Sequence, residues 1–135
     1  MGDFLYACVQ LVHNLGAAAV VGSPAAAWWL AQDNIVAQRK IAWLILYAWA
    51  IQVASGAGFG ATTYYLKHEL PELTSVGLFA LVVKVSCALI SFCLVAFYLR
   101  AGQSWSMRGR ARLWQGLFIW GLAALISAAF LRWYA

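Results

Sequence analysis

Charge is the scarcest property of this sequence. Of its 135 residues, nine are Lys or Arg and four are Asp or Glu, so that charged side chains make up 10% of the chain. Soluble domains carry about 25%. With 65% of its residues hydrophobic, the chain is not an ordinary soluble domain, and we predict an integral membrane protein whose main partner is the lipid bilayer. We interpret the net charge of +5 as a sign of membrane orientation and expect no nucleic-acid partner.

Cysteine is also rare, and its placement excludes two kinds of site. Cys8, Cys87 and Cys93 lie in apolar segments and form no CxxC pair, which argues against a disulfide framework and against a zinc site. Buried free cysteines are most often small apolar fillers.

Nothing in the sequence resembles a hydrolytic triad, and the glycine run 56–60 has no strand before it, so we reject a nucleotide loop. Enzymatic activity stays an open question, and a non-enzymatic role is favoured.

Four long apolar segments make up most of the chain. They cover residues 4–31, 41–66, 73–100 and 113–131, and each is long enough to cross a bilayer, which takes about 20 apolar residues. Pro71 and Glu72 are expected to start the third helix. The N-terminus lacks a basic region, and its apolar run is too long for a cleavable signal peptide. We predict an all-α fold in which residues 1–135 form one membrane domain, a bundle of four transmembrane helices.

Basic residues gather on one side of this bundle. That side holds Arg39, Lys40, Arg100, Arg108, Arg110 and Arg112. The other side holds Lys67 and Arg132, together with Asp3, Glu69 and Glu72. The positive-inside rule places the first side in the cytoplasm. Both termini are then expected on the outer, periplasmic side, and the protein is expected to be a multi-pass protein of a bacterial inner membrane.

Small residues are concentrated in two of the helices. The first contains GAAAVVGSPAAA at residues 16–27, and the second contains a GxxxG pair, Gly56 and Gly60. Small side chains let helices approach closely in lipid. We therefore expect both stretches to pack against neighbouring helices.

The third segment carries a full charge, Lys84, near its middle. A charge there costs at least about 2.5–3.5 kcal/mol on insertion scales. At ~1.5 Å per residue, His13 lies ~14 Å and Lys84 ~16 Å below the outer ends of their helices, and Ser55 lies at about the same depth. Three more polar side chains fall within a turn of this plane: Asn14, Gln52 and Cys87. We predict a packed polar layer to which three helices contribute.

No acidic residue can pair with Lys84 at this depth. The four acids are Asp3, Asp33, Glu69 and Glu72, and all lie near a membrane boundary. Four arrangements stay open for the lysine: hydrogen bonds to Asn14, Gln52 or Ser55, loss of its proton on burial, a water-filled cavity, or an acidic group from outside the chain, such as a haem propionate or an anionic lipid. Lys84 and these three polar residues form our predicted cofactor-binding set.

His13 is the one deep imidazole, and its spacing predicts that it shares a helix face with Gln10 and Asn14. A Cys–His metal site is open only to His13 with Cys87, and a hydrogen-bonded packing histidine is the plainer interpretation.

Haem b is a rival cofactor, because four-helix bundles bind cofactors between facing helices. Intrinsic bis-histidine ligation needs a second histidine at matched depth, and His68 lies about three turns nearer the outside. A haem shared with a partner subunit stays open.

Two segments carry a family resemblance. LVHNLGAAAVVG at residues 11–22, followed by the glycine-bearing second helix and TSVGLFALVVKVSCALISFCLVAFYLR at residues 74–100, resembles the CopD-like copper resistance membrane domain. That family has a histidine followed by small residues in an early helix, and a "G…K" pattern in a later helix that ends in a basic residue. The resemblance implies copper handling or copper-linked redox biology at the inner membrane. A copper ion would be the cofactor, His13 and Lys84 the matching positions, and a periplasmic copper protein a partner.

The chain departs from that family in one respect and also fits a function of another class. It has no methionine-rich or histidine-rich outer segment, and Met1 and Met107 are its only methionines, so soft copper ligands are scarce. The alternative is a non-catalytic small transmembrane subunit that packs against a larger respiratory or oxidase complex and contacts its haem. The aromatic residues, 16% of the chain, suit contact with other membrane subunits as well as with lipid.

Overall fold

The computed structural model describes residues 1–69 and 72–134, with the backbone alone for Tyr134. It contains four helices, α1 (Gly2–Trp29), α2 (Ile35–Lys67), α3 (Ser75–Ala101) and α4 (Met107–Tyr134), and a short 3-10 turn, η1 (Gly102–Ser104). No strand occurs in the described ranges. All four helices are long and apolar enough to cross a membrane. The predicted all-α bundle of four transmembrane helices is therefore confirmed, whereas the side on which the termini lie stays a prediction.

Two helices begin six residues earlier than the sequence pattern predicts. α2 starts at Ile35 instead of residue 41, because the Asn34 side chain accepts a hydrogen bond from the Ala37 N–H at 2.9 Å and caps the helix. α4 starts at Met107 instead of residue 113, and Ser106 Oγ accepts a hydrogen bond at 3.1 Å from a backbone N–H of its first turn. Charged side chains in these turns lower the local hydropathy, so the apolar pattern alone places both starts too late.

The link between α2 and α3 turns through the left-handed region of backbone conformation. His68 has φ 55°, and its N–H donates to the Tyr64 carbonyl at 2.8 Å, which closes the last turn of α2. α3 begins at Ser75, where the Thr74 hydroxyl oxygen accepts a backbone N–H at 3.1 Å. The expected helix start at Pro71 lies outside the described residues. His68 is exposed in this turn, far along α2 from the polar layer.

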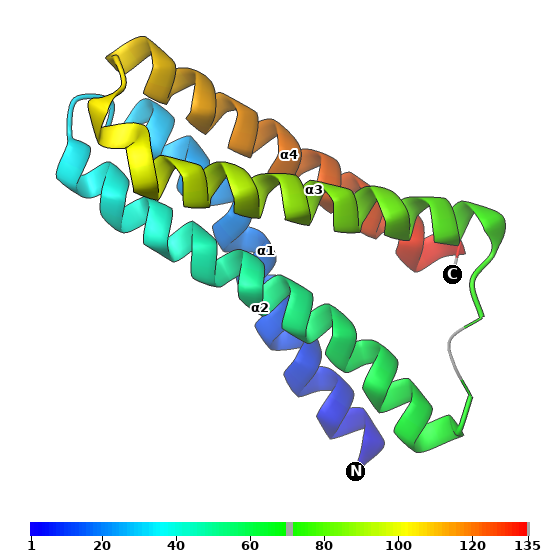
Figure 1. The fold of residues 1–135 in the computed structure, drawn as a ribbon. Coiled ribbons are helices and arrows are strands. Elements are labelled where there is room, and N and C mark those ends of the chain that lie inside the picture. Colours follow the sequence, from blue (N-terminus) through cyan, green and yellow to red (C-terminus); the bar gives the residue numbers. More distant parts are fainter. Residues whose placement is uncertain (70–71, 135) are drawn as a thin grey trace.

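The helices form two antiparallel hairpins. α1 packs against α2 and α3 packs against α4, while α1 also contacts α4 and α2 contacts α3. The hairpins lie close together at the end that holds the α1–α2 and α3–α4 links, and they diverge toward the end that holds both termini (Figure 1). We call the first the closed end of the bundle and the second the open end.

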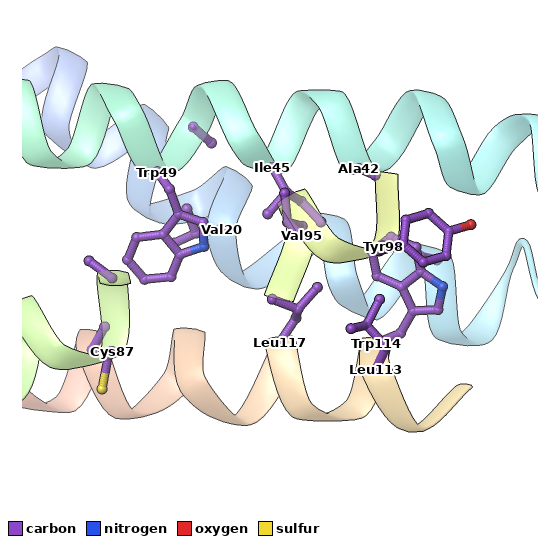
Figure 2. Packing of buried hydrophobic residues seen from close by; sticks show 14 residues of the cluster. Val20, Ala42, Ile45, Trp49, Cys87, Val95, Tyr98, Leu113, Trp114 and Leu117 are labelled. Atoms are coloured by element: carbon purple, nitrogen blue, oxygen red, sulfur yellow. The ribbon is translucent and has the colours of Figure 1, made fainter. Parts of the chain in front are cut away.

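The apolar core lies toward the closed end (Figure 2). Its large, fully buried side chains come from three helices: Ile45 of α2, Val95 and Tyr98 of α3, and Trp114 and Leu117 of α4. α1 contributes small residues and comes very close to α4. A Cβ added to Gly121 would lie 2.8 Å from the Val20 carbonyl oxygen, so this approach requires a glycine.

The two stretches of small residues behave differently. The stretch 16–27 packs as expected, since the buried residues of α1 all fall in it. The GxxxG pair of α2 does not. No atom of a neighbouring helix lies within 4 Å of a Cβ placed on Gly56 or Gly60. The expectation that this pair packs against another helix of the chain is wrong for the described residues, and the pair leaves part of α2 uncovered.

A buried amide joins three elements at the closed end. Gln38 is 1% exposed, and its Nε2 donates to the carbonyl oxygens of Ala31 and Gln32 at 2.8 and 2.9 Å. Its Oε1 accepts a hydrogen bond from the Tyr98 hydroxyl at 3.1 Å. The α1–α2 link is thereby tied to α3, which fixes how the two hairpins meet.

Candidate functional site

The candidate site begins where the apolar core ends. The core residues of α1 and α2 stop at Val20 and Trp49, and the next inward-facing side chains toward the open end are polar: His13 of α1, Gln52 and Ser55 of α2, and Lys84 of α3. Three helices therefore contribute to one polar layer, as the depth estimate predicted.

The His13 ring lies between a serine and the lysine. Its Nδ1 is 2.7 Å from Ser55 Oγ, and its Nε2 is 3.2 Å from Lys84 Nζ. Ser55 donates its own hydroxyl proton to the Ile51 carbonyl at 2.7 Å, so its oxygen accepts from His13 Nδ1–H. That leaves Nε2 with a lone pair, which accepts from the Lys84 ammonium. The bonds run from Lys84 through a neutral His13 to Ser55 and the α2 backbone.

Two further residues of α2 hold α1 in register. Gln52 Nε2 donates to the His13 carbonyl oxygen. This contact depends on Gly16, because a Cβ there would lie 2.5 Å from Gln52 Nε2. Phe59 meets the His13 ring edge to face, with ring centroids 5.5 Å apart. The imidazole is thus positioned through both of its nitrogens, through its ring contact with Phe59 and through the His13 carbonyl.

The charge of Lys84 is not neutralised within the described chain. Its hydrogen-bond partner is the neutral His13 ring, and both residues are partly buried. Asp3 lies in the first turn of α1, and the other three acids lie in the links between helices. A protonated Lys84 has three N–H donors, and His13 takes one of them. In its protonated form, Lys84 would therefore place a positive charge with two further N–H donors inside the bilayer-spanning layer.

Two residues of the predicted sites lie elsewhere. Asn14 is exposed, and its Oδ1 accepts a hydrogen bond from Gln10 Nε2 at 2.7 Å, so Gln10 and Asn14 do not share the inward face of His13. Cys87 is 1% exposed and belongs to the apolar core (Figure 2). Among the described residues, no three His, Cys, Asp or Glu side chains gather closely enough to hold a metal ion. Cys87 is a core residue, and its role as a metal ligand stays a prediction without structural support.

A second polar contact between α1 and α2 was not predicted from the sequence. The Tyr6 hydroxyl lies 2.8 Å from Thr63 Oγ1, which donates to the Phe59 carbonyl at 2.9 Å. Tyr6 stands seven residues before His13, and Thr63 stands eight after Ser55, so each pair shares a helix face. That spacing could have revealed the contact. Polar bonds therefore continue along the α1–α2 contact toward the open end.

Comparison with protein-family models, with curated proteins and with solved structures finds no match to this chain. The resemblance to the CopD-like domain therefore stays a prediction. The residues that bear on function are the cluster of Lys84, His13, Ser55 and Gln52. This cluster can hold a positive charge at a defined place within the bilayer and can offer N–H donors to a ligand or partner.

Proposed function

We propose that this chain is a non-catalytic subunit of a larger membrane assembly, in which Lys84 supplies a positive charge to an acidic group held by a partner inside the bilayer. The acidic group is a carboxylate side chain or a haem propionate. One observation carries the proposal: Lys84 lies in a spanning helix, and its bonded partner in the described chain is a neutral imidazole. Charged residues inside membranes are rare and are found paired or in functional sites.

The surroundings of Lys84 suit this role. His13 occupies one N–H donor of the ammonium, and the remaining donors are free to bind an acidic oxygen. Because Ser55 fixes the His13 ring, the ammonium nitrogen is positioned in advance and loses little conformational entropy on pairing. An acidic partner would make the layer electrically neutral, which removes the main cost of a charge in lipid.

The proposal includes a location. Six of the nine basic residues fall at the closed end, so the positive-inside rule supports a cytoplasmic closed end and periplasmic termini in a bacterial inner membrane. A tag fused to the C-terminus is expected to react with a membrane-impermeant reagent in cells whose inner membrane is intact. Labelling that requires permeabilisation of that membrane would reverse the orientation.

Copper handling is the second candidate, supported by the resemblance at His13 and Lys84. In this structure both ring nitrogens of His13 are engaged in hydrogen bonds, so a metal would have to displace Lys84 or Ser55. Copper titration of the purified protein tests this function. His13→Ala is expected to weaken binding, while Cys87→Ala leaves it unchanged. Equal binding by the native chain and both variants would remove the site.

The main proposal is tested by Lys84→Met in the full chain, expressed in its native membrane and extracted in mild detergent. Methionine preserves length and apolarity and removes the charge. We expect normal insertion and yield, loss of the higher-mass assembly on native electrophoresis, and loss of any haem absorption that co-purifies with the native chain. Lys84→Arg, which keeps the charge, is expected to retain part of the assembly.

Lys40→Met is the matched control, because Lys40 is an exposed lysine at the closed end. It is expected to leave assembly unchanged. An assembly that survives Lys84→Met as well as it survives Lys40→Met would contradict the proposal. So would a native chain that migrates alone.

A further inference from the structure

Two carboxamides lie on the outer surface of α1. Gln10 and Asn14 are both exposed. Counted from the start of α1 at Gly2, they lie ~12 Å and ~18 Å along a helix that spans the membrane. Gln10 Nε2 donates to Asn14 Oδ1 at 2.7 Å. Hydrocarbon offers no hydrogen-bonding groups. A polar pair on this face is therefore poorly suited to lipid alone.

The bond between the two amides satisfies only part of their hydrogen-bonding capacity. Each amide has two N–H donors and one carbonyl oxygen. Among the described residues, both N–H groups of Asn14 and the Oε1 atom of Gln10 have no partner. Donors and an acceptor thus point outward from neighbouring turns. Such a pattern is complementary to a second copy of itself.

The same face of α1 becomes small toward the closed end. Ala18 and Gly22 continue the four-residue spacing of Gln10 and Asn14, and both are exposed. A Cβ added to Gly22 would meet nothing within 4 Å, so the fold of the single chain does not require a glycine there. We call Gln10, Asn14, Ala18 and Gly22 the α1 stripe. Two small residues spaced by four let transmembrane helices approach closely, and polar side chains hydrogen-bond across such contacts.

We infer that the α1 stripe is the contact surface of a homodimer. A two-fold axis along the membrane normal places each stripe position opposite its own copy at the same depth, which makes the contact self-complementary. Asn14 N–H groups then donate to Gln10 Oε1 or Asn14 Oδ1 of the other copy, and Ala18 and Gly22 allow the backbones to meet. Lys84 is not part of this stripe, so this contact and the proposed assembly can each fail without the other.

Association of the full-length protein in lipid vesicles tests the inference. Donor-labelled and acceptor-labelled chains are mixed, and energy transfer is measured while the protein is diluted with lipid. The native chain is expected to dimerise. The double variant Gln10→Leu/Asn14→Leu removes the carboxamides and favours insertion, and Gly22→Leu blocks the close approach. Each is expected to weaken dimerisation on the order of tenfold.

Gly56→Leu is the matched control, because Gly56 lies on α2 and its Cβ position is equally free of neighbours. It is expected to leave energy transfer unchanged. A native chain that is monomeric at all lipid ratios would overturn the inference. So would dimers that resist both stripe variants, or dimers that Gly56→Leu alone disrupts, since those would use the GxxxG face of α2.

Discussion

The closed end of the bundle is filled by aliphatic and aromatic side chains from α2, α3 and α4 that pack around small residues of α1. At the open end, by contrast, polar contacts join α1 to α2, and the two hairpins diverge (Figure 1). No residue of α1 before Gly16 is buried. Lys84, which has no acidic partner among the described residues, lies between the two regions. The difference suggests that packing at the closed end maintains the fold, whereas the polar layer presents Lys84 to a partner.

The largest expected effect comes from breaking the closed end. Trp114 is 1% exposed and lies against Tyr98 with ring centroids 4.9 Å apart. Trp114→Ala is expected to lower the free energy of unfolding by about 3–5 kcal/mol, because it leaves a large cavity. Thermal unfolding of the purified protein in detergent measures this. Trp133→Ala is the matched control, since Trp133 is 83% exposed, and equal losses in the two variants would refute a core at this end.

A smaller loss is expected from removing the buried amide that ties the link to α3. Gln38→Leu deletes three hydrogen bonds and leaves the Tyr98 hydroxyl without its acceptor. We expect a loss of about 2–3 kcal/mol, in the upper part of the range of about 1–3 kcal/mol for buried polar groups deprived of partners. The same unfolding experiment measures it. Gln103→Leu, at an exposed glutamine, should change stability by less than about 0.5 kcal/mol, and a similar result for Gln38→Leu would show that the amide does not join the hairpins.

The smallest of the three losses is expected at the polar layer. Gly16→Ala places a methyl group 2.5 Å from Gln52 Nε2, so the amide must move and give up its bond to the His13 carbonyl. We expect a loss of about 1–2 kcal/mol, within the range for overpacked positions. Gly22→Ala on the same helix meets open space and serves as the control. Equal stability of the two variants would mean that α1 and α2 are not in close contact at this level.

Hydropathy predicts the four helices because membrane spans need long apolar segments, but it does not detect helical turns that extend beyond the apolar region. The first turns of α2 and α4, which carry Arg39 and Arg110, therefore fall in predicted links. Depth along each helix brought His13, Ser55, Gln52 and Lys84 into one plane. Depth alone cannot show which way a side chain faces.

The two misplaced residues show this limit. Asn14 follows His13 by one position and therefore lies about 100° around the helix, away from α2. Cys87 stands one turn beyond Lys84 toward the closed end, where the neighbours are already apolar. The direction of each helix face depends on which helices are neighbours, and no periodicity in a single segment specifies that.

The central claim is that Lys84 serves a partner and does not hold the bundle together. It is tested most directly by comparing the unfolding free energies of the isolated native chain and Lys84→Met in the same detergent. A buried polar group replaced by a packed apolar side chain is often neutral or stabilising. The account therefore predicts that Lys84→Met is at least as stable as the native chain. A loss of about 3 kcal/mol or more, the cost of breaking a buried structural contact, would contradict it and make Lys84 a structural residue.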